Sequence, residues 1–263
     1  MWLIGYTVSR MIRRTFRAGL VVGILLLLVL AVPGAASTAL LASKSASSTP
    51  FALGTLIVTG PGPADCPSGT DCVSYSVSCP DVIQSIDGYL SVGSTPGPTR
   101  GMATFFTGAG GLNWLTDADP NMPAFMADLR NNGIVTVEST WATDWRFASS
   151  GEDAGLEHLS CRAATVIRYV YDVYYLPLGL TPAAGECGFC LIGNSGGASQ
   201  ISYALEFYGL EDILNAVIPS GGPTYGAVAK SCMNTSGEEA YQFTAPRRDD
   251  IDHATGYLNK DGP

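Results

Sequence analysis

A serine flanked by glycines is the residue in this chain whose type and spacing best suit chemistry. Residues 193–197 have the sequence Gly-Asn-Ser-Gly-Gly, which fits the pattern G-x-S-x-G. An apolar stretch, 189–192, precedes it, and a helical apolar pattern over 201–208 follows it. On a tight turn between a strand and a helix, glycines beside the serine relieve steric crowding around a strained backbone. The pattern therefore predicts Ser195 as a nucleophile, with an incidental glycine turn as the alternative.

A second glycine-rich turn lies earlier in the chain. Residues 107–111, Thr-Gly-Ala-Gly-Gly, directly follow an apolar stretch at 102–106. An oxyanion hole needs one N–H from the residue after the nucleophile, here Gly196, and another from a neighbouring loop. We expect the backbone of Thr107 or Gly108 to supply the second N–H. A phosphate-binding loop is less well supported, because the Lys-Ser/Thr and acidic partner of such loops are missing, and a plain tight turn stays possible.

Elements that could position these turns follow from the apolar patterns. Short strands are predicted before residue 100, over 55–59 and 73–77. From residue 101 onward, strands alternate with helices: strands are predicted over 102–106, 134–137, 189–192 and 215–218, and helices over 123–130, 156–173 and 201–208. Strands that alternate with crossover helices indicate a parallel sheet covered on both faces.

Taken together, the two turns and their flanking strands resemble the α/β-hydrolase family over residues 102–222. This resemblance implies an α/β-hydrolase-like, mostly parallel sheet with helices on both faces, and a serine hydrolase that cleaves ester or related acyl bonds. The substrate would be a small-molecule, lipid or polymer ester, and no metal or organic cofactor is implied. Many family members have His-Gly in the oxyanion loop, where this chain has Thr107-Gly108, so the subfamily stays open.

The proton acceptor for the serine is the missing part of this site. A serine hydroxyl needs a base, and the family order places a histidine downstream of Ser195. The chain has two histidines. His158 lies upstream in a helical pattern, where we expect a helix surface, and His253 follows Gly222 by only about 30 residues, too few for two strand–helix units. We expect the base to be His253 or, preferably, a histidine beyond Pro263, in a continuation that also supplies the last strands of the sheet.

The N-terminus predicts export. Residues 1–17 are basic, an unbroken apolar run follows, and Pro33 and small residues end that run. We predict a signal peptide over 1–36, a linker over 37–54 and the hydrolase-like domain over 55–263. The protein would then be secreted, without stable membrane insertion after cleavage. An uncleaved anchor and a twin-arginine signal remain alternatives.

The predicted mature domain is acidic. The whole chain has a formal net charge of −9 at pH 7, and five of its 14 basic residues lie in residues 1–50, which contain no acidic residue. Residues 51–263 therefore contain nine basic and 23 acidic residues, a net charge of −14. Such a surface repels phosphate backbones, so nucleic acid is excluded as a partner.

The seven cysteines take their meaning from export. In an oxidising compartment they predict structural disulfides, whose connectivity is open and which leave one cysteine over. Cys187 and Cys190 have C-x-x-C spacing, but Cys190 lies in a predicted apolar strand, which favours a structural role. A secreted thiol-redox protein using this pair is the weaker alternative, and a non-catalytic hydrolase-fold binding protein is the other, supported by the missing base.

Overall fold

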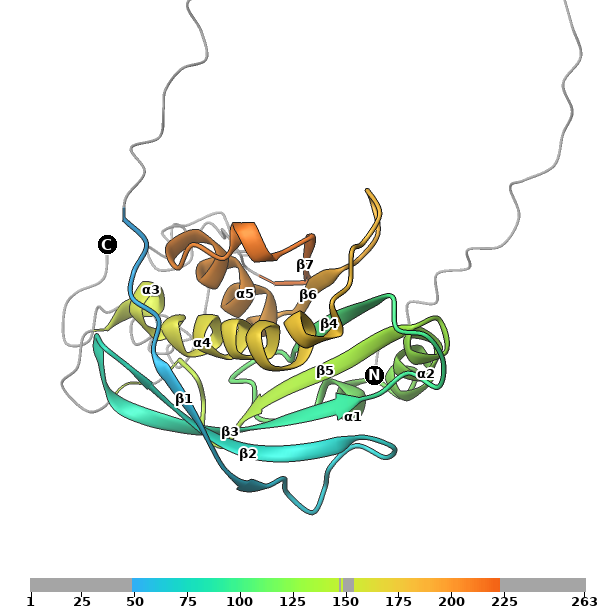
Figure 1. Ribbon diagram of the computed structural model, residues 1–263. Helices are drawn as coiled ribbons and strands as arrows, with labels where there is room; N and C mark the ends of the chain where they lie inside the picture. The colour runs from blue at the N-terminus through green and yellow to red at the C-terminus, as the bar shows by residue number, and fades with distance from the viewer. Residues whose placement is uncertain (1–48, 147, 149–153, 223–263) are drawn as a thin grey trace, which may run out of the picture. The chain divides into compact units, whose positions relative to one another are not determined.

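The computed structural model describes residues 49–146, 148 and 154–222 (Figure 1). The predicted signal peptide and nearly all of the Ser/Thr/Ala-rich segment that follows it lie outside these residues. Cys232 and His253 lie outside them as well, so the structure does not place either side chain.

One sheet contains all the described strands, in the order β1-β2-β3-β5-β4-β6-β7. The strands are β1 Thr55–Pro61, β2 Asp71–Cys79, β3 Val82–Gly93, β4 Gly101–Phe106, β5 Ile134–Trp141, β6 Phe189–Asn194 and β7 Ala216–Ser220. Pairs among β4, β5, β6 and β7 are parallel, whereas β1, β2 and β3 form an antiparallel meander that joins β5. The predicted parallel sheet from residue 101 onward is therefore confirmed, and it extends into an antiparallel part.

Strand β3 was missed by the sequence analysis. Its twelve residues do not alternate regularly, since Val82 and Ile83 are both apolar and Gln84 and Ser85 both polar, and a glycine lies in the middle. A Cβ on Gly88 would lie 2.5 Å from the Tyr75 hydroxyl oxygen and 2.6 Å from the carbonyl oxygen of Thr140. This glycine marks a close approach of neighbouring strands, although in sequence it reads as a break in a strand.

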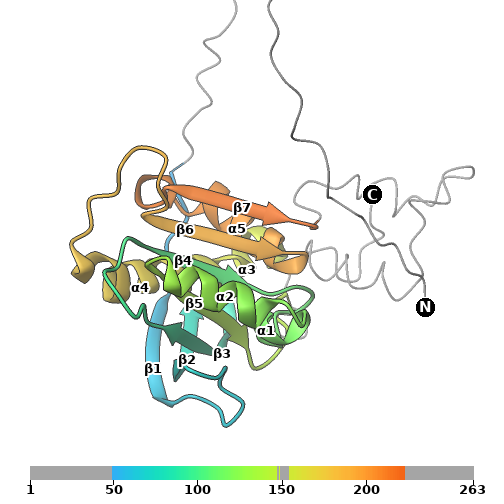
Figure 2. The same cartoon turned by 90° about the vertical axis from the view of Figure 1, so that its right-hand side faces the viewer.

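Helices cover both faces of the sheet, as predicted (Figure 2). On one face lie α1 Leu115–Ala118 and α2 Met122–Asn131, and on the other lie α3 Gly155–Leu159, α4 Cys161–Val170 and α5 Gly196–Phe207. The described residues also form three short helical turns, η1 Tyr171–Tyr175, η2 Leu176–Leu178 and η3 Glu211–Ile213. No helix in the described part of the chain is long and apolar enough to cross a membrane.

Two apolar cores lie against the central strands. The larger one fills the space between the sheet and the α4–α5 face, and the smaller one packs under α1 and α2. Strand β4 contributes to both, since Phe106 faces the larger core and Phe105 the smaller one, and both side chains are fully buried. Burial of one such side chain stabilises a fold by about 1.5–3 kcal/mol. β4 is therefore held on both faces at the position from which the glycine-rich turn emerges.

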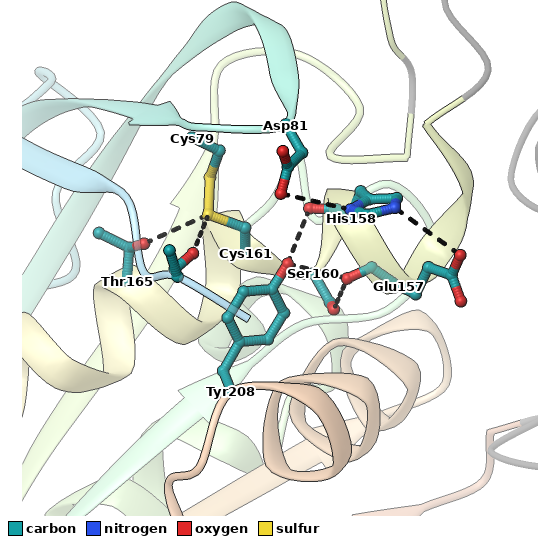
Figure 3. A network of polar contacts seen from close by, with 9 residues as sticks. Cys79, Asp81, Glu157, His158, Ser160, Cys161, Thr165 and Tyr208 are labelled. Carbon is teal, nitrogen blue, oxygen red and sulfur yellow. Dashed lines mark hydrogen bonds and ion pairs between the residues drawn. A yellow bond between two sulfur atoms is a disulfide. The ribbon is translucent and has the colours of Figure 1, made fainter. Parts of the chain in front are cut away.

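Three disulfides join six of the cysteines, Cys66–Cys72, Cys79–Cys161 and Cys187–Cys190. Structural disulfides were predicted, and the pairing is now defined for these six. The Cys79–Cys161 bond connects the end of β2 to the start of α4 (Figure 3). Its two cysteines are 82 residues apart, so it closes a far longer loop than the other two bonds.

We expect loss of the Cys79–Cys161 bond to destabilise the protein more than loss of Cys66–Cys72. In the chain-entropy account, the longer loop corresponds to about 4.5 kcal/mol and the six-residue loop to about 2 kcal/mol. Urea unfolding of the double variants C79A/C161A and C66A/C72A, compared with the unmodified protein, measures both changes. Equal losses in the two variants would contradict this ranking.

Candidate active site

Ser195 lies on the turn between β6 and α5 in a conformation that side chains rarely adopt. Its φ is 52° and its ψ is −117°. Among the described residues, the only other non-glycine residue with positive φ is Ala109, in the glycine-rich turn. Such a conformation costs about 1–3 kcal/mol and persists only where surrounding contacts determine it. Here the Ser195 N–H donates to the carbonyl oxygen of Ser220 at 2.8 Å, and the Ser195 carbonyl accepts from the Ala198 N–H at 2.9 Å.

The serine turn lies directly against the glycine-rich turn. Strand β4 is the neighbour of β6 and runs parallel to it, so the segments that follow the two strands emerge at the same edge of the sheet. A Cβ on Gly197 would lie 2.6 Å from the carbonyl carbon of Phe106. A Cβ on Gly196 would lie 2.9 Å from the nitrogen of Ala109. Glycine at these positions lets the two backbones touch.

Gly108 is the residue of the glycine-rich turn that meets the serine side chain. A Cβ on Gly108 would lie 3.0 Å from the Ser195 Cβ and 3.7 Å from its Oγ. Within the described part of the chain, the backbone N–H groups of Gly108 and Gly196 donate to no acceptor. A hydroxyl with two free N–H groups beside it is what acyl transfer requires of its nucleophile and oxyanion hole. Thr107, the other candidate donor, is buried one residue before Gly108.

Further polar side chains close to the turns were missed by the sequence analysis. Asp144, just after β5, contacts Gly110, and the Arg146 side chain binds both of its oxygens, with Nε–Oδ1 at 3.0 Å and Nη2–Oδ2 at 2.6 Å. The backbone N–H of Trp145 donates to the carbonyl oxygen of Gly110 at 3.1 Å. The loop after β5 therefore supports the glycine-rich turn, and its Asp-x-Arg spacing was the one sequence signal for it.

A buried carboxylate lies on β5, one strand beyond β4. Glu138 is almost fully buried and accepts a hydrogen bond from the Thr116 N–H at 2.9 Å, near the start of α1. Burial raises the pKa of this carboxyl group above its ordinary value, and the hydrogen bonds from Thr116 partly oppose that shift. Glu138 thus binds helix α1 to the sheet, and it precedes the serine in the chain, unlike the acid that the predicted order requires.

His158 lies in α3, in the polar network drawn in Figure 3. Its Nδ1 is 3.7 Å from an Asp81 oxygen, its Nε2 is 3.8 Å from a Glu157 oxygen, and its ring stacks on Phe51 at 5.0 Å. None of these partners belongs to the serine turn or the glycine-rich turn. This agrees with the helix-side position expected for His158.

Among the described residues, no group of three or more His, Cys, Asp or Glu side chains is arranged to hold a metal ion.

Neither a protein-family model nor a curated protein sequence matches the chain. Solved structures with similar folds include a thermostable carboxyl esterase from Bacillus coagulans, at 13% identity and a TM-score of 0.41, covering 62% of this chain and 48% of that one. Brefeldin A esterase, a bacterial homologue of human hormone sensitive lipase, has 17% identity and a TM-score of 0.42, and the match covers 76% of this chain and 51% of that one. Est1E from Butyrivibrio proteoclasticus has 17% identity and a TM-score of 0.40, and the match covers 68% of this chain and 60% of that one.

This chain thus spans about half to three fifths of the length of these esterases. All three likenesses are loose. The sheet order, the glycine-rich turn after β4 and the serine turn after β6 give it an α/β-hydrolase-like fold.

Substitution of Gly108 by alanine tests the contact between the two turns. The added methyl group would press on the Ser195 Cβ, and misplacement by an ångström can cost about 100-fold in rate, so we expect kcat to fall by roughly 10- to 100-fold. Gly97→Ala is the control, because a Cβ there meets no atom within 4 Å. Hydrolysis of a short-chain chromogenic ester gives both values, and equal kcat in the two variants would show that the contact between Gly108 and Ser195 does not affect turnover.

Proposed function

We propose that the protein is a serine hydrolase that cleaves an ester or similar acyl bond through an acyl-enzyme on Ser195. The observation that best supports this is the conformation of Ser195. A strained positive-φ serine, at the start of a helix and against a glycine-rich turn whose Gly108 N–H donates to no acceptor among the described residues, serves no evident packing purpose. It matches the needs of a nucleophile that must project from a sharp turn.

In the proposed reaction, the Ser195 Oγ attacks the carbonyl carbon of the ester while a base takes the hydroxyl proton. The negative charge that develops on the carbonyl oxygen accepts hydrogen bonds from the N–H of Gly196 and from that of Gly108 or Thr107. The C–O bond to the alcohol then breaks, and the base returns the proton to the leaving oxygen. Water attacks the acyl-enzyme by the same route and releases the acid. We assign the base to a histidine outside the described residues, of which His253 is the one in this sequence.

The proposed chemistry implies that the substrate is a small-molecule, lipid or polymer ester. A thiol-redox role is not favoured, because Cys190 is buried within β6 and bonded to Cys187.

Ser195→Ala should abolish turnover and covalent labelling. We expect kcat for a short-chain chromogenic ester to fall by at least about 10³-fold, since the nucleophile is lost. A fluorophosphonate probe should label the unmodified chain and not the variant. Ser202→Ala, a buried serine later in the same helix, is the matched control and should keep both activities. Labelling that survives Ser195→Ala, or turnover no faster than background in the full-length protein with any continuation beyond Pro263, would contradict the proposed function, and the second outcome would favour a binding role.

We also propose that the protein is exported through its N-terminal segment. Residues 1–36 have the basic start, apolar run and small-residue exit of a signal peptide. N-terminal sequencing of the protein recovered outside the cell should find a start at or shortly after Ser37. Recovery of a chain that keeps Met1 in the membrane fraction would instead indicate an uncleaved anchor.

A further inference from the structure

The glycine-rich turn and the helix that begins after Ser195 are joined by one buried tryptophan. Trp141, the last residue of β5, is almost fully buried. Its backbone N–H donates to the carbonyl oxygen of Gly111 at 2.8 Å, and its indole Nε1–H donates to the Oε1 of Gln200 at 2.8 Å. Gln200 belongs to α5, the helix that begins directly after Ser195. Trp141 thus bonds the glycine-rich turn through its backbone N–H and the helix that follows Ser195 through its indole N–H.

The orientation of the Gln200 amide follows from the indole. An indole N–H can only donate, so the oxygen of the amide faces Trp141 and its NH₂ group faces away. A Cβ on Gly111 would lie 2.5 Å from the Trp141 Cδ1 and 3.4 Å from the Gln200 Nε2, so both side chains lie against the turn. Gln200 is fully buried, and its Nε2 has no hydrogen-bond partner within the described residues. A buried amide with an unmet donor is costly, so an apolar residue would serve packing better here.

Within the turn, Gly111 is hydrogen-bonded to the candidate oxyanion donor, Gly108. The Gly111 N–H donates to the carbonyl oxygen of Gly108 at 2.9 Å, which closes the turn on itself. Gly108 in turn faces the Ser195 side chain. Because the Trp141 indole lies against Gly111 and is hydrogen-bonded to Gln200, a change in the orientation of the indole would displace Gly111 and, through it, Gly108.

We propose that Gln200 and Trp141 are positioning residues, which set the distance between the Ser195 hydroxyl and the second N–H of the oxyanion hole. This inference rests on the proposed serine-hydrolase function. Neither side chain would touch the substrate, because both are buried beneath the turns. Their contribution would appear only as the carbonyl oxygen becomes charged, since preorganised donors act on the charge of the transition state.

Gln200→Leu tests this proposal, because it keeps an apolar group of similar size and removes the acceptor. We expect kcat for a chromogenic ester to fall at least about 10-fold while KM changes by less than about 2-fold, the pattern of an interaction made only in the transition state. Trp141→Phe removes the same hydrogen bond from the other side and should produce the same split. If Gln200→Leu does not fold, Trp141→Phe gives the comparison alone.

Tyr208→Phe is the matched control. The Tyr208 hydroxyl lies just after the opposite end of α5, where it donates to the carbonyl oxygens of Glu157 and His158 at 2.9 and 3.2 Å (Figure 3). Its removal should lower stability, measured by urea unfolding, and leave kcat within about 2-fold of the unmodified chain, since it bonds neither turn.

The double variant Q200L/W141F separates a shared hydrogen bond from two unrelated defects. Its kcat should be no lower than that of the single variant with the lower kcat, because both substitutions remove the same hydrogen bond. Multiplied losses in the double variant, or wild-type kcat in Gln200→Leu, would overturn the positioning role. The variants are compared with an unmodified protein whose turnover is first shown to depend on Ser195. If the unmodified protein shows no such turnover, the result counts against the proposed function and not against Gln200 alone.

Discussion

The contact between two backbones, at the ends of β4 and β6, is the constraint on which the rest of the site depends. Gly196 and Gly197 lie so close to the glycine-rich turn that a side chain on either would overlap its backbone. This contact leaves Ser195 in its positive-φ conformation, and the cost of that conformation is met by the burial of β4 on both faces of the sheet. The two cores thus stabilise a local geometry that would not persist in an isolated turn.

The antiparallel part of the sheet supports the site from a distance. Strand β3 pairs with β5, whose last residue is Trp141, and Tyr75 on β2 packs edge-on against the Trp141 indole at 5.7 Å. The Tyr75 hydroxyl contacts the Ser139 hydroxyl at 3.0 Å, and burial raises the pKa of that tyrosine well above its ordinary value. A neutral, buried aromatic layer therefore lies beneath the glycine-rich turn.

Much of the parallel half of this fold could be predicted from the sequence, because buried parallel strands consist of continuous apolar runs. The predicted runs at 102–106 and 189–192 are β4 and β6, and the serine motif lies where the predicted strand and helix meet. The predicted helix over 156–173 is interrupted after α3 and ends in a π-helical turn, features set by tertiary contacts and not by periodicity. The bond between Trp141 and Gln200 joins residues 59 apart in the chain, and no local pattern could indicate it.

The interleaved strand order has a consequence for the order of assembly. Strand β4 lies between β5 and β6, yet β6 follows it in sequence only after β5 and α4, and Phe106 pairs with Gly193 across that interval. Pairings between distant parts of a chain form slowly, because loop closure must precede the contacts that compensate for it. The two turns therefore meet only when the longest-range pairing of the parallel half is made. An incompletely folded chain would therefore contain both glycine motifs without the contact between their turns.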